Sequence, residues 1–202
     1  MIINYFLRKP LLYKDIEKYQ YKLLFCVASY SVYNIYFVKD FTFLNHILFG
    51  HLLTDLLFIP FNKMDTIIHH MLGIGFIYYP TLFSIPLRPI YLHQINFLKV
   101  ETSSIFLCSS YFLKEYKKQS KHQYIQITSN ISNVLLLSTF FKFRCYDFLY
   151  KILKNPDFYN DMIIPNNTMS KYYIYTTVGA FCLLNGYWFS KLANVFYKTI
   201  TK

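Results

Sequence analysis

The sequence predicts an all-α membrane protein with about six helices, and three observations support this fold class. Hydrophobic residues make up 54% of the 202 residues, and the mean hydropathy is +0.25. Charged residues make up 15% of the chain, whereas a soluble domain carries about a quarter. The charges are grouped, so the stretches between them approach the ~20 apolar residues that a transmembrane helix needs. A chain of this length has room for one membrane domain.

Polar or helix-breaking residues divide the chain into the predicted helices. Lys39-Asp40 separates the first two, and Asn62-Lys63 separates the next two. A proline-bracketed turn around Arg88 follows, and then come a charged loop at 114–123 and a polar loop at 154–171. The predicted helices are 22–38, 41–60, 64–85, 89–113, 124–150 and 172–197. Residues 1–21 are predicted to be a cytoplasmic N-terminal segment, 22–198 the six-helix membrane domain and 199–202 a cytoplasmic tail.

The net charge of +11 is interpreted as a sign of membrane topology and of contact with anionic lipids, not of nucleic-acid binding. With a cytoplasmic N-terminus, most basic loop residues fall on the cytoplasmic side, which the positive-inside rule favours for both termini. Residues 1–22 carry several charges and no apolar core of signal-peptide type, so the first membrane helix is expected to act as the targeting signal. Asn166-Asn167-Thr168 is a glycosylation pattern on the loop that this topology makes lumenal.

The four cysteines lie far apart in the sequence, and each falls within a predicted helix. Their spacing is typical neither of a metal site nor of a disulfide framework. They are predicted to be reduced packing residues, namely Cys26, Cys108, Cys145 and Cys182.

The main candidate site comes from ionisable residues inside predicted membrane helices, where such groups usually face the bundle interior or a wet cavity. His51 and Asp55 are four residues apart and share one helix face. The connection between helices 41–60 and 64–85 is short, so Asp55 is expected to reach His69 or His70. Asp65 is four residues before His69. Two alternatives stay open: Asp65 caps its helix, and the His51–Asp55 pair is structural.

Further polar residues in the later helices are predicted to join the same cavity, open toward the cytoplasm. Each also has a structural alternative: a hydrogen-bonding strut, a contact between helices, aromatic packing, or a basic side chain that snorkels to the membrane surface. Arg144 is in addition three residues before Asp147, and His93 is expected to be an interface residue. The predicted cavity residues are Glu101, Ser104, Arg144, Asn185 and Trp188.

Several other classes of membrane protein fit the residues less well. Membrane di-iron enzymes need several histidine boxes, whereas this chain has 6 histidines and one adjacent pair. A zinc ion held by His51, Asp55 and one histidine of the His69-His70 pair stays open. A retinal pigment needs a seventh helix, and a transporter more often shows inverted repeats, of which the sequence has no sign.

The order of these motifs resembles the TLC-domain family, which includes the ceramide synthases. "GHLLTDLL", "DTIIHHMLGI", "ETSSIFL", an arginine in the fifth helix and "LNGYWFSKL" follow one another over about residues 20–200. The resemblance implies a six-helix domain of the endoplasmic reticulum or connected membranes, enclosing a lipid-accommodating cavity. By position, His69 and His70 match the histidine pair that opens the ceramide synthase motif.

The resemblance also implies a chemistry for the site. In the ceramide synthases an acyl chain is transferred from acyl-CoA to a sphingoid amine, so His69 and His70 are the implied catalytic residues, with Asp55 as the group that orients them. His51, Asp65 and the later polar residues are the implied lipid-binding set. No bound cofactor or metal is expected, and acyl-CoA is the implied co-substrate. Residues 71–92 lack the further His and Asp of that motif, so the chain is most similar to the small TLC-only proteins. A non-catalytic cargo receptor or regulator of lipid composition is therefore the alternative.

Overall fold

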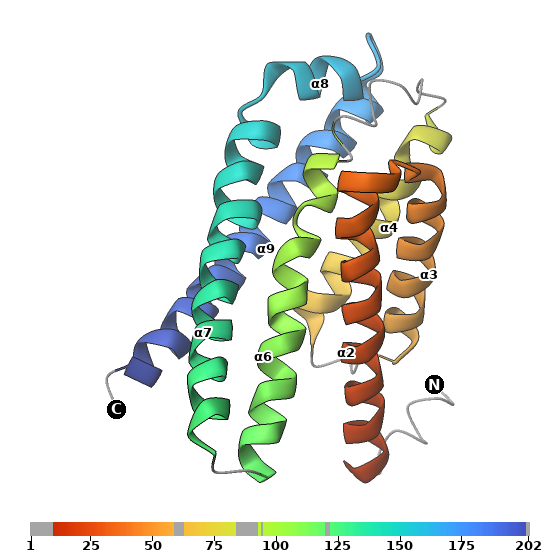
Figure 1. Cartoon of the computed structure of the whole chain (residues 1–202). Helices are drawn as coiled ribbons and strands as arrows, with labels where there is room; N and C mark the ends of the chain where they lie inside the picture. Colours follow the sequence, from red (N-terminus) through yellow and green to blue (C-terminus); the bar gives the residue numbers. More distant parts are fainter. Residues whose placement is uncertain (1–9, 59–62, 84–92, 94, 120–121, 201–202) are drawn as a thin grey trace.

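The prediction of an all-α fold is confirmed by a computed structural model, which describes residues 10–58, 63–83, 93, 95–119 and 122–200. Every described element is a helix, and no strand occurs within these ranges. Most helices run along the length of the molecule, while α9 crosses behind them at an angle (Figure 1). In chain order the elements are α2 (Pro10–Tyr33), α3 (Phe41–Phe58), α4 (Met64–Leu82), α6 (Glu101–Gln119), α7 (Gln123–Phe140), α8 (Pro156–Met162) and α9 (Thr168–Ile200), with π-helical segments η1 (Asn34–Val38), η2 (Phe141–Asp147) and η3 (Leu149–Leu153).

Several predicted boundaries are wrong. The predicted helix 89–113 is interrupted by a turn at residues 99–100, after which α6 begins at Glu101. The predicted first helix, 22–38, corresponds to α2 and η1, and α2 extends back to Pro10 at the edge of the described residues, so much of the predicted N-terminal segment is helical. Residues 114–119 of the predicted charged loop at 114–123 belong to the C-terminal part of α6, which ends at Gln119. The predicted loop at 154–171 contains the short helix α8 and the start of α9. The predicted turn around Arg88 lies outside the described residues.

Two short connections fix how neighbouring helices meet. Lys39 has a positive φ of 61°, and its N–H donates to the Asn34 carbonyl, which ends η1. The Asp40 side chain then accepts from the Phe43 N–H at 3.1 Å and caps α3. Because only two residues separate the helices, α3 turns back to pack beside α2.

The α7 helix widens into π-helical turns from Phe141 onward, which the sequence did not predict. An inserted residue in a helix rotates every later side chain around the helix axis, and such turns are frequent at functional sites. Arg144 lies within η2 and is buried, as is Asp147. The wide turns therefore direct a basic side chain into the bundle.

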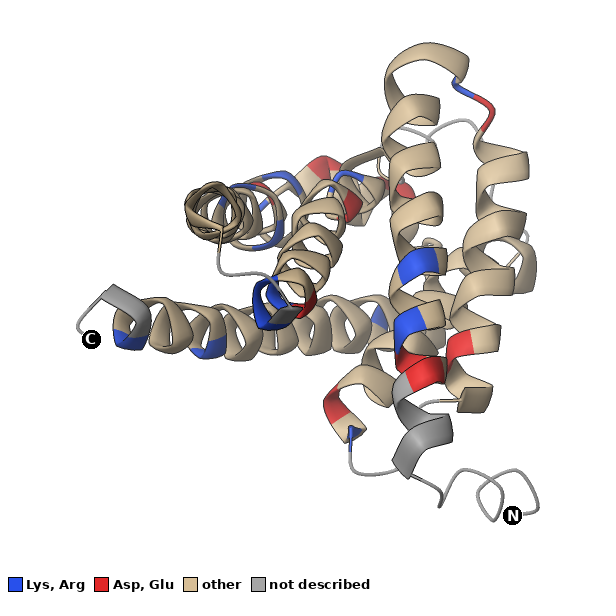
Figure 2. Cartoon of the chain, turned by 60° about the horizontal axis from the view of Figure 1, so that its bottom comes forward, with Lys and Arg blue, Asp and Glu red and all other residues tan. Residues whose placement is uncertain are grey.

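The outer faces of the bundle are strongly apolar. Leu183 is 77% exposed and Phe37 is 74% exposed. Charged residues gather toward helix ends, and long helical stretches carry none (Figure 2). Among the described helices, one, Phe41–Phe58, is long and apolar enough by length and composition to cross a membrane. Exposed apolar surface of this kind marks contact with a membrane or with a partner.

Two buried clusters hold the helices together. The larger cluster joins α4, η3, α8 and α9, and it includes Phe76, Tyr79, Phe158 and Phe181. The smaller cluster joins α2, η1 and α3 with Leu98, a residue just before α6. Members of both clusters also line the central cavity described below.

A hydrogen-bonded chain within the larger cluster attaches α4 to the connection between α8 and α9. The Tyr79 hydroxyl donates to the Met162 carbonyl at 2.6 Å and lies 2.5 Å from the Ser170 hydroxyl. The Ser170 oxygen in turn accepts from the Ile164 N–H at 3.0 Å. Tyr79 is fully buried, so each of these groups depends on the others for its hydrogen bonds.

Replacing Tyr79 by phenylalanine is expected to destabilise the protein by about 1–3 kcal/mol, because the Met162 carbonyl and the Ser170 hydroxyl lose a buried partner. Each kcal/mol corresponds to a melting-temperature decrease of about 2–4 °C for a chain of this size. Thermal unfolding in detergent measures the effect. Tyr78→Phe is the matched control, since Tyr78 lies beside it on α4 but is 38% exposed. Equal melting temperatures for the two variants would contradict the assigned network.

Candidate functional site

A cavity of about 430 Å³ lies between α2, α3, α4, α6, η2 and α9. Its apolar walls include Leu24, Leu48 and Ile77. Aromatic rings close one part of it: the ring centroids of Phe76 and Phe97 are 3.9 Å apart, and those of Phe97 and Phe181 are 5.7 Å apart. The volume falls within the roughly 300–1,000 Å³ that is usual for ligand pockets.

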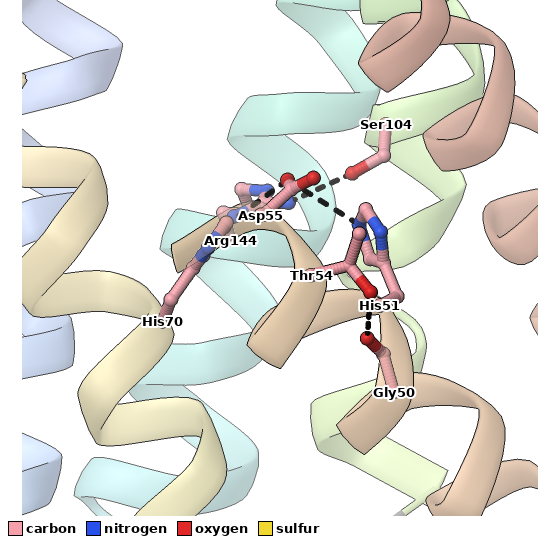
Figure 3. Close-up of polar contacts among 7 residues, drawn as sticks. All are labelled: Gly50, His51, Thr54, Asp55, His70, Ser104 and Arg144. Carbon is pink, nitrogen blue, oxygen red and sulfur yellow. Dashed lines mark hydrogen bonds and ion pairs between the residues drawn. The ribbon is translucent and has the colours of Figure 1, made fainter. Parts of the chain in front are cut away.

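A carboxylate flanked by two histidines lies in the wall of the cavity. Asp55 Oδ2 is 3.8 Å from His51 Nε2 and 3.9 Å from His70 Nε2, so α3 and α4 both contribute (Figure 3). All three residues are buried. Both distances exceed a hydrogen bond, so the groups interact electrostatically. The predicted proximity of Asp55 to the histidine pair is therefore present in the structure.

His69 faces a different part of the cavity from its neighbour. Its ring centroid lies 4.9 Å from that of Trp188 and 5.6 Å from that of Phe181, both edge-to-face. The ring of His70 is 5.6 Å away and tilted by 54°. The two adjacent imidazoles therefore divide between an aromatic wall on α9 and the carboxylate on α3.

Four polar atoms of this cluster are buried without a hydrogen-bond partner among the described residues. Buried polar groups are nearly always satisfied by protein, water or a ligand. These atoms belong to side chains that line the cavity: His51 Nδ1, Asp55 Oδ1, His69 Nδ1 and His70 Nδ1.

Arg144 extends from η2 into the cavity instead of snorkelling to the surface. Its Nε donates to Ser103 Oγ at 2.7 Å and its Nη2 to Ser104 Oγ at 3.0 Å, and its side chain is buried (the second bond is drawn in Figure 3). Asp147 does not pair with it, because its Oδ1 lies 2.9 Å from Lys142 Nζ and 3.3 Å from Lys151 Nζ. The snorkelling alternative is wrong for Arg144.

Two charged pairs lie at the cavity wall or directly beside it, and they join helices that are distant in sequence. Lys63 Nζ is 3.1 Å from Glu17 Oε1, and both residues line the cavity. Asp65 Oδ2 accepts from Trp188 Nε1 at 2.8 Å and lies 3.4 Å from Lys191 Nζ. The N-cap residue of α4 is Lys63, and Asp65 lies in the first helical turn, where its carboxylate also accepts from the Thr66 N–H. Through Trp188 and Lys191, Asp65 links α4 to α9.

A family model described as the TLC domain matches residues 11–194, nearly the whole chain. The chain belongs to the TLC-domain family. TLC domains are membrane-associated and have lipid-related functions. The resemblance inferred from the motifs is therefore confirmed. No curated protein and no solved structure gives a match to the chain.

The TLC domain brings most of the predicted site residues to one cavity. Asp65 and Asn185 do not line it: Asp65 contacts Trp188 from outside, and Asn185 is buried elsewhere on α9. His93 also lies away from it, with its Nε2 2.8 Å from Asp161 Oδ2. The predicted residues that line the cavity are His51, Asp55, His69, His70, Glu101, Ser104, Arg144 and Trp188.

Several lining residues of the TLC domain were not predicted from sequence. Glu17, Gln20 and Tyr21 line the cavity because α2 starts at Pro10, twelve residues earlier than expected. Ser103 is not among the predicted cavity residues, yet it accepts the shorter of the two Arg144 bonds.

Two further expectations can be compared with the geometry. The four cysteines are unpaired, as predicted. Within the described residues no group of three or more His, Cys, Asp or Glu side chains is arranged to hold a metal ion. The zinc alternative at His51, Asp55 and the histidine pair therefore gains no support.

Proposed function

We propose that this protein is a six-span membrane protein of the endoplasmic reticulum or connected membranes, with both termini in the cytoplasm. It binds the chain of a membrane lipid, an acyl chain or a sphingoid base, in a cavity that opens toward the cytoplasm. It acts there in membrane lipid metabolism or homeostasis. The family's membrane association and the exposed apolar faces of the helices support the membrane setting.

One observation carries the proposal: the lining of the cavity combines apolar walls with a group of polar and charged side chains. A wholly apolar ligand would leave the polar side chains without a partner, and a wholly polar one would not match the leucine and phenylalanine walls. An amphiphile with one long chain and a small polar end meets both requirements. Single-chain lipids and lipid intermediates have this form.

Filling the cavity by Gly73→Leu is expected to reduce the lipid that co-purifies with the protein by about tenfold or more, because a leucine in the wall takes the volume that the chain would occupy. Gly73 lines the cavity, and a Cβ atom there would lie 3.0 Å from Leu52 Cδ1. Mass spectrometry of lipid extracted from the purified protein measures the change.

Gly50→Leu is the matched control for this test. A Cβ atom at Gly50 meets nothing within 4 Å, and Gly50 does not line the cavity, so the bound lipid should be unchanged. The proposal would be contradicted if no lipid species were enriched in the purified wild-type protein relative to its fraction in the surrounding membrane.

A second candidate function is acyl transfer of the ceramide synthase type, favoured by the His70–Asp55–His51 arrangement. An imidazole nitrogen would remove the proton from a lipid amine as the amine attacks the thioester carbon of acyl-CoA. The C–N bond of the amide forms, the C–S bond breaks, and the CoA thiolate leaves and takes up that proton. Asp55 would orient the imidazole and stabilise its charged form.

The competing candidate is a cargo receptor or regulator of lipid composition that binds lipid without turnover. Its cluster of His51, Asp55 and His70 would hold α3 against α4. The two candidates differ in whether loss of the histidines removes a lipid product.

A further inference from the structure

The buried guanidinium of Arg144 has more hydrogen-bond capacity than its neighbours use. An arginine carries five N–H donors. Among the described residues two of them are used, one each toward the hydroxyls of Ser103 and Ser104. Arg144 is only 6% exposed. Three donors of a charged group are therefore left without a described protein partner.

The charge of Arg144 has no carboxylate within ion-pair distance among the described residues, and Glu101 acts on it from farther away. None of the ion pairs within the described residues includes Arg144. Serine hydroxyls are neutral and cannot balance the charge, and buried charges in proteins are ordinarily paired. The guanidinium carbon also lies 5.3 Å from the Phe140 ring centroid and 6.0 Å from the Trp188 ring centroid. Aromatic faces favour a cation but do not neutralise it.

The other charged groups of the cavity wall have different surroundings. Lys63 is paired with Glu17, and Lys191 lies beside Asp65. Asp55 lies between two imidazoles, and Glu101 lines the cavity without an ion pair to a described residue. Arg144 is thus the cation of the described cavity wall with no carboxylate within ion-pair distance, and an anion that enters the cavity would find its counter-charge there.

We propose that Arg144, together with Ser103 and Ser104, binds the anionic head group of a single-chain lipid, a carboxylate or a phosphate, whose chain fills the apolar part of the cavity. This inference rests on the proposed lipid-binding function and names the class of its ligand. A planar guanidinium fork matches both anions with paired N–H donors. The rings of Phe140 and Trp188 border the head group.

Trp188 provides the readout, because it is the single tryptophan of the chain and lines the cavity close to Arg144. The full chain is reconstituted into phosphatidylcholine nanodiscs. Its fluorescence is titrated with bromine-labelled chains of one length that carry a carboxylate, a phosphate monoester or a neutral alcohol. Bromine quenches tryptophan on contact.

The carboxylate or the phosphate chain is expected to bind at least about tenfold more tightly than the alcohol, since a hydrogen-bonded charge pair is lost with the alcohol. The comparison of the two anions shows which head group the site takes. Arg144→Gln is expected to abolish the preference for the anion while the alcohol still quenches, and Arg144→Lys to retain part of it.

Lys142→Gln is the matched control, because it removes a positive charge two residues away on the same π-helical segment. Lys142 lies beside Asp147, which keeps Lys151 at 3.3 Å in the variant. The preference for the anion should therefore match that of the wild type.

Equal binding of all three chains by the wild-type protein would overturn the inference while leaving lipid binding intact, and it does not depend on any variant folding. Full retention of the anion preference in Arg144→Gln would overturn it too. Absence of quenching by every chain would instead contradict the proposed lipid-binding function itself.

Discussion

Replacing His69 and His70 together by alanine is expected to lower formation of the lipid product by about 10²–10⁴-fold, the usual contribution of a general acid–base group. The expectation follows from the acyl-transfer candidate. The two imidazoles face different walls of one cavity, and His70 lies 3.9 Å from the Asp55 carboxylate. The measurement is mass spectrometry of sphingolipids and acyl-lipids in cells that lack their own ceramide synthases and express either protein.

The matched control removes two other histidines, by His46→Ala and His122→Ala. Both are exposed and outside the cavity, so the lipid products should match those of the wild type. The two single variants, His69→Ala and His70→Ala, show which imidazole carries the reaction. A lipid change of wild-type size in a correctly inserted double variant would exclude the acyl-transfer candidate and favour the non-catalytic receptor or regulator.

The part of the site built from local spacing could be predicted from sequence. His51 and Asp55 share a helix face because they are four residues apart, and the short link to α4 brings His70 to the same carboxylate. Both arguments need only helix periodicity and a short loop. The all-α fold followed in the same way from composition and from the grouping of charges.

The arrangement around Arg144 could not be predicted in the same way. A regular α-helix predicts which side chains share a face, but the π-helical turns from Phe141 onward change that relation. The sequence gives no local signal for such turns. The partners of Arg144 also lie about forty residues earlier, on α6, and contacts over that separation are set by tertiary packing.

Other errors arose from signals that the chain does contain. Asn155-Pro156 begins α8, with the Asn155 side chain accepting from the Asp157 N–H at 3.1 Å. This is a helix-start pattern, whereas the density of prolines and polar residues over 154–171 predicts a loop. The position of Asp65 in the first turn of α4 gives no sign of its partners on α9, because Trp188 and Lys191 lie more than a hundred residues later.

Replacing Asp55 by leucine is expected to lower formation of the lipid product by at least about 100-fold without lowering the melting temperature. A carboxylate that orients a catalytic imidazole contributes a factor of this size or more. The melting temperature, in contrast, is expected to stay the same or to rise. A buried ionised carboxylate has a large desolvation cost, so an apolar residue of similar volume in its place is often neutral or stabilising by about 1–4 kcal/mol.

The surroundings of Asp55 explain why its replacement should lower the activity but not the stability. Its Oδ2 lies beyond hydrogen-bond distance from both imidazoles, at 3.8 and 3.9 Å, and its Oδ1 has no partner among the described residues. The carboxylate therefore receives little of the hydrogen bonding that would offset its burial. A residue kept at a cost in stability is typical of a functional site.

The comparison needs the variant's melting temperature in detergent and its lipid products in the same cells. Asp15→Leu, which removes an exposed carboxylate of α2, is the control for a change in charge alone. Asp55→Asn keeps the shape of the side chain without its charge, so it should lose product as Asp55→Leu does if the charge orients the imidazole. The opposite result would be a clear fall in the melting temperature of Asp55→Leu, with the lipid product falling only in proportion to the amount of folded protein. It would identify the carboxylate as a structural link between α3 and α4. The non-catalytic candidate would then be the better explanation of the cluster.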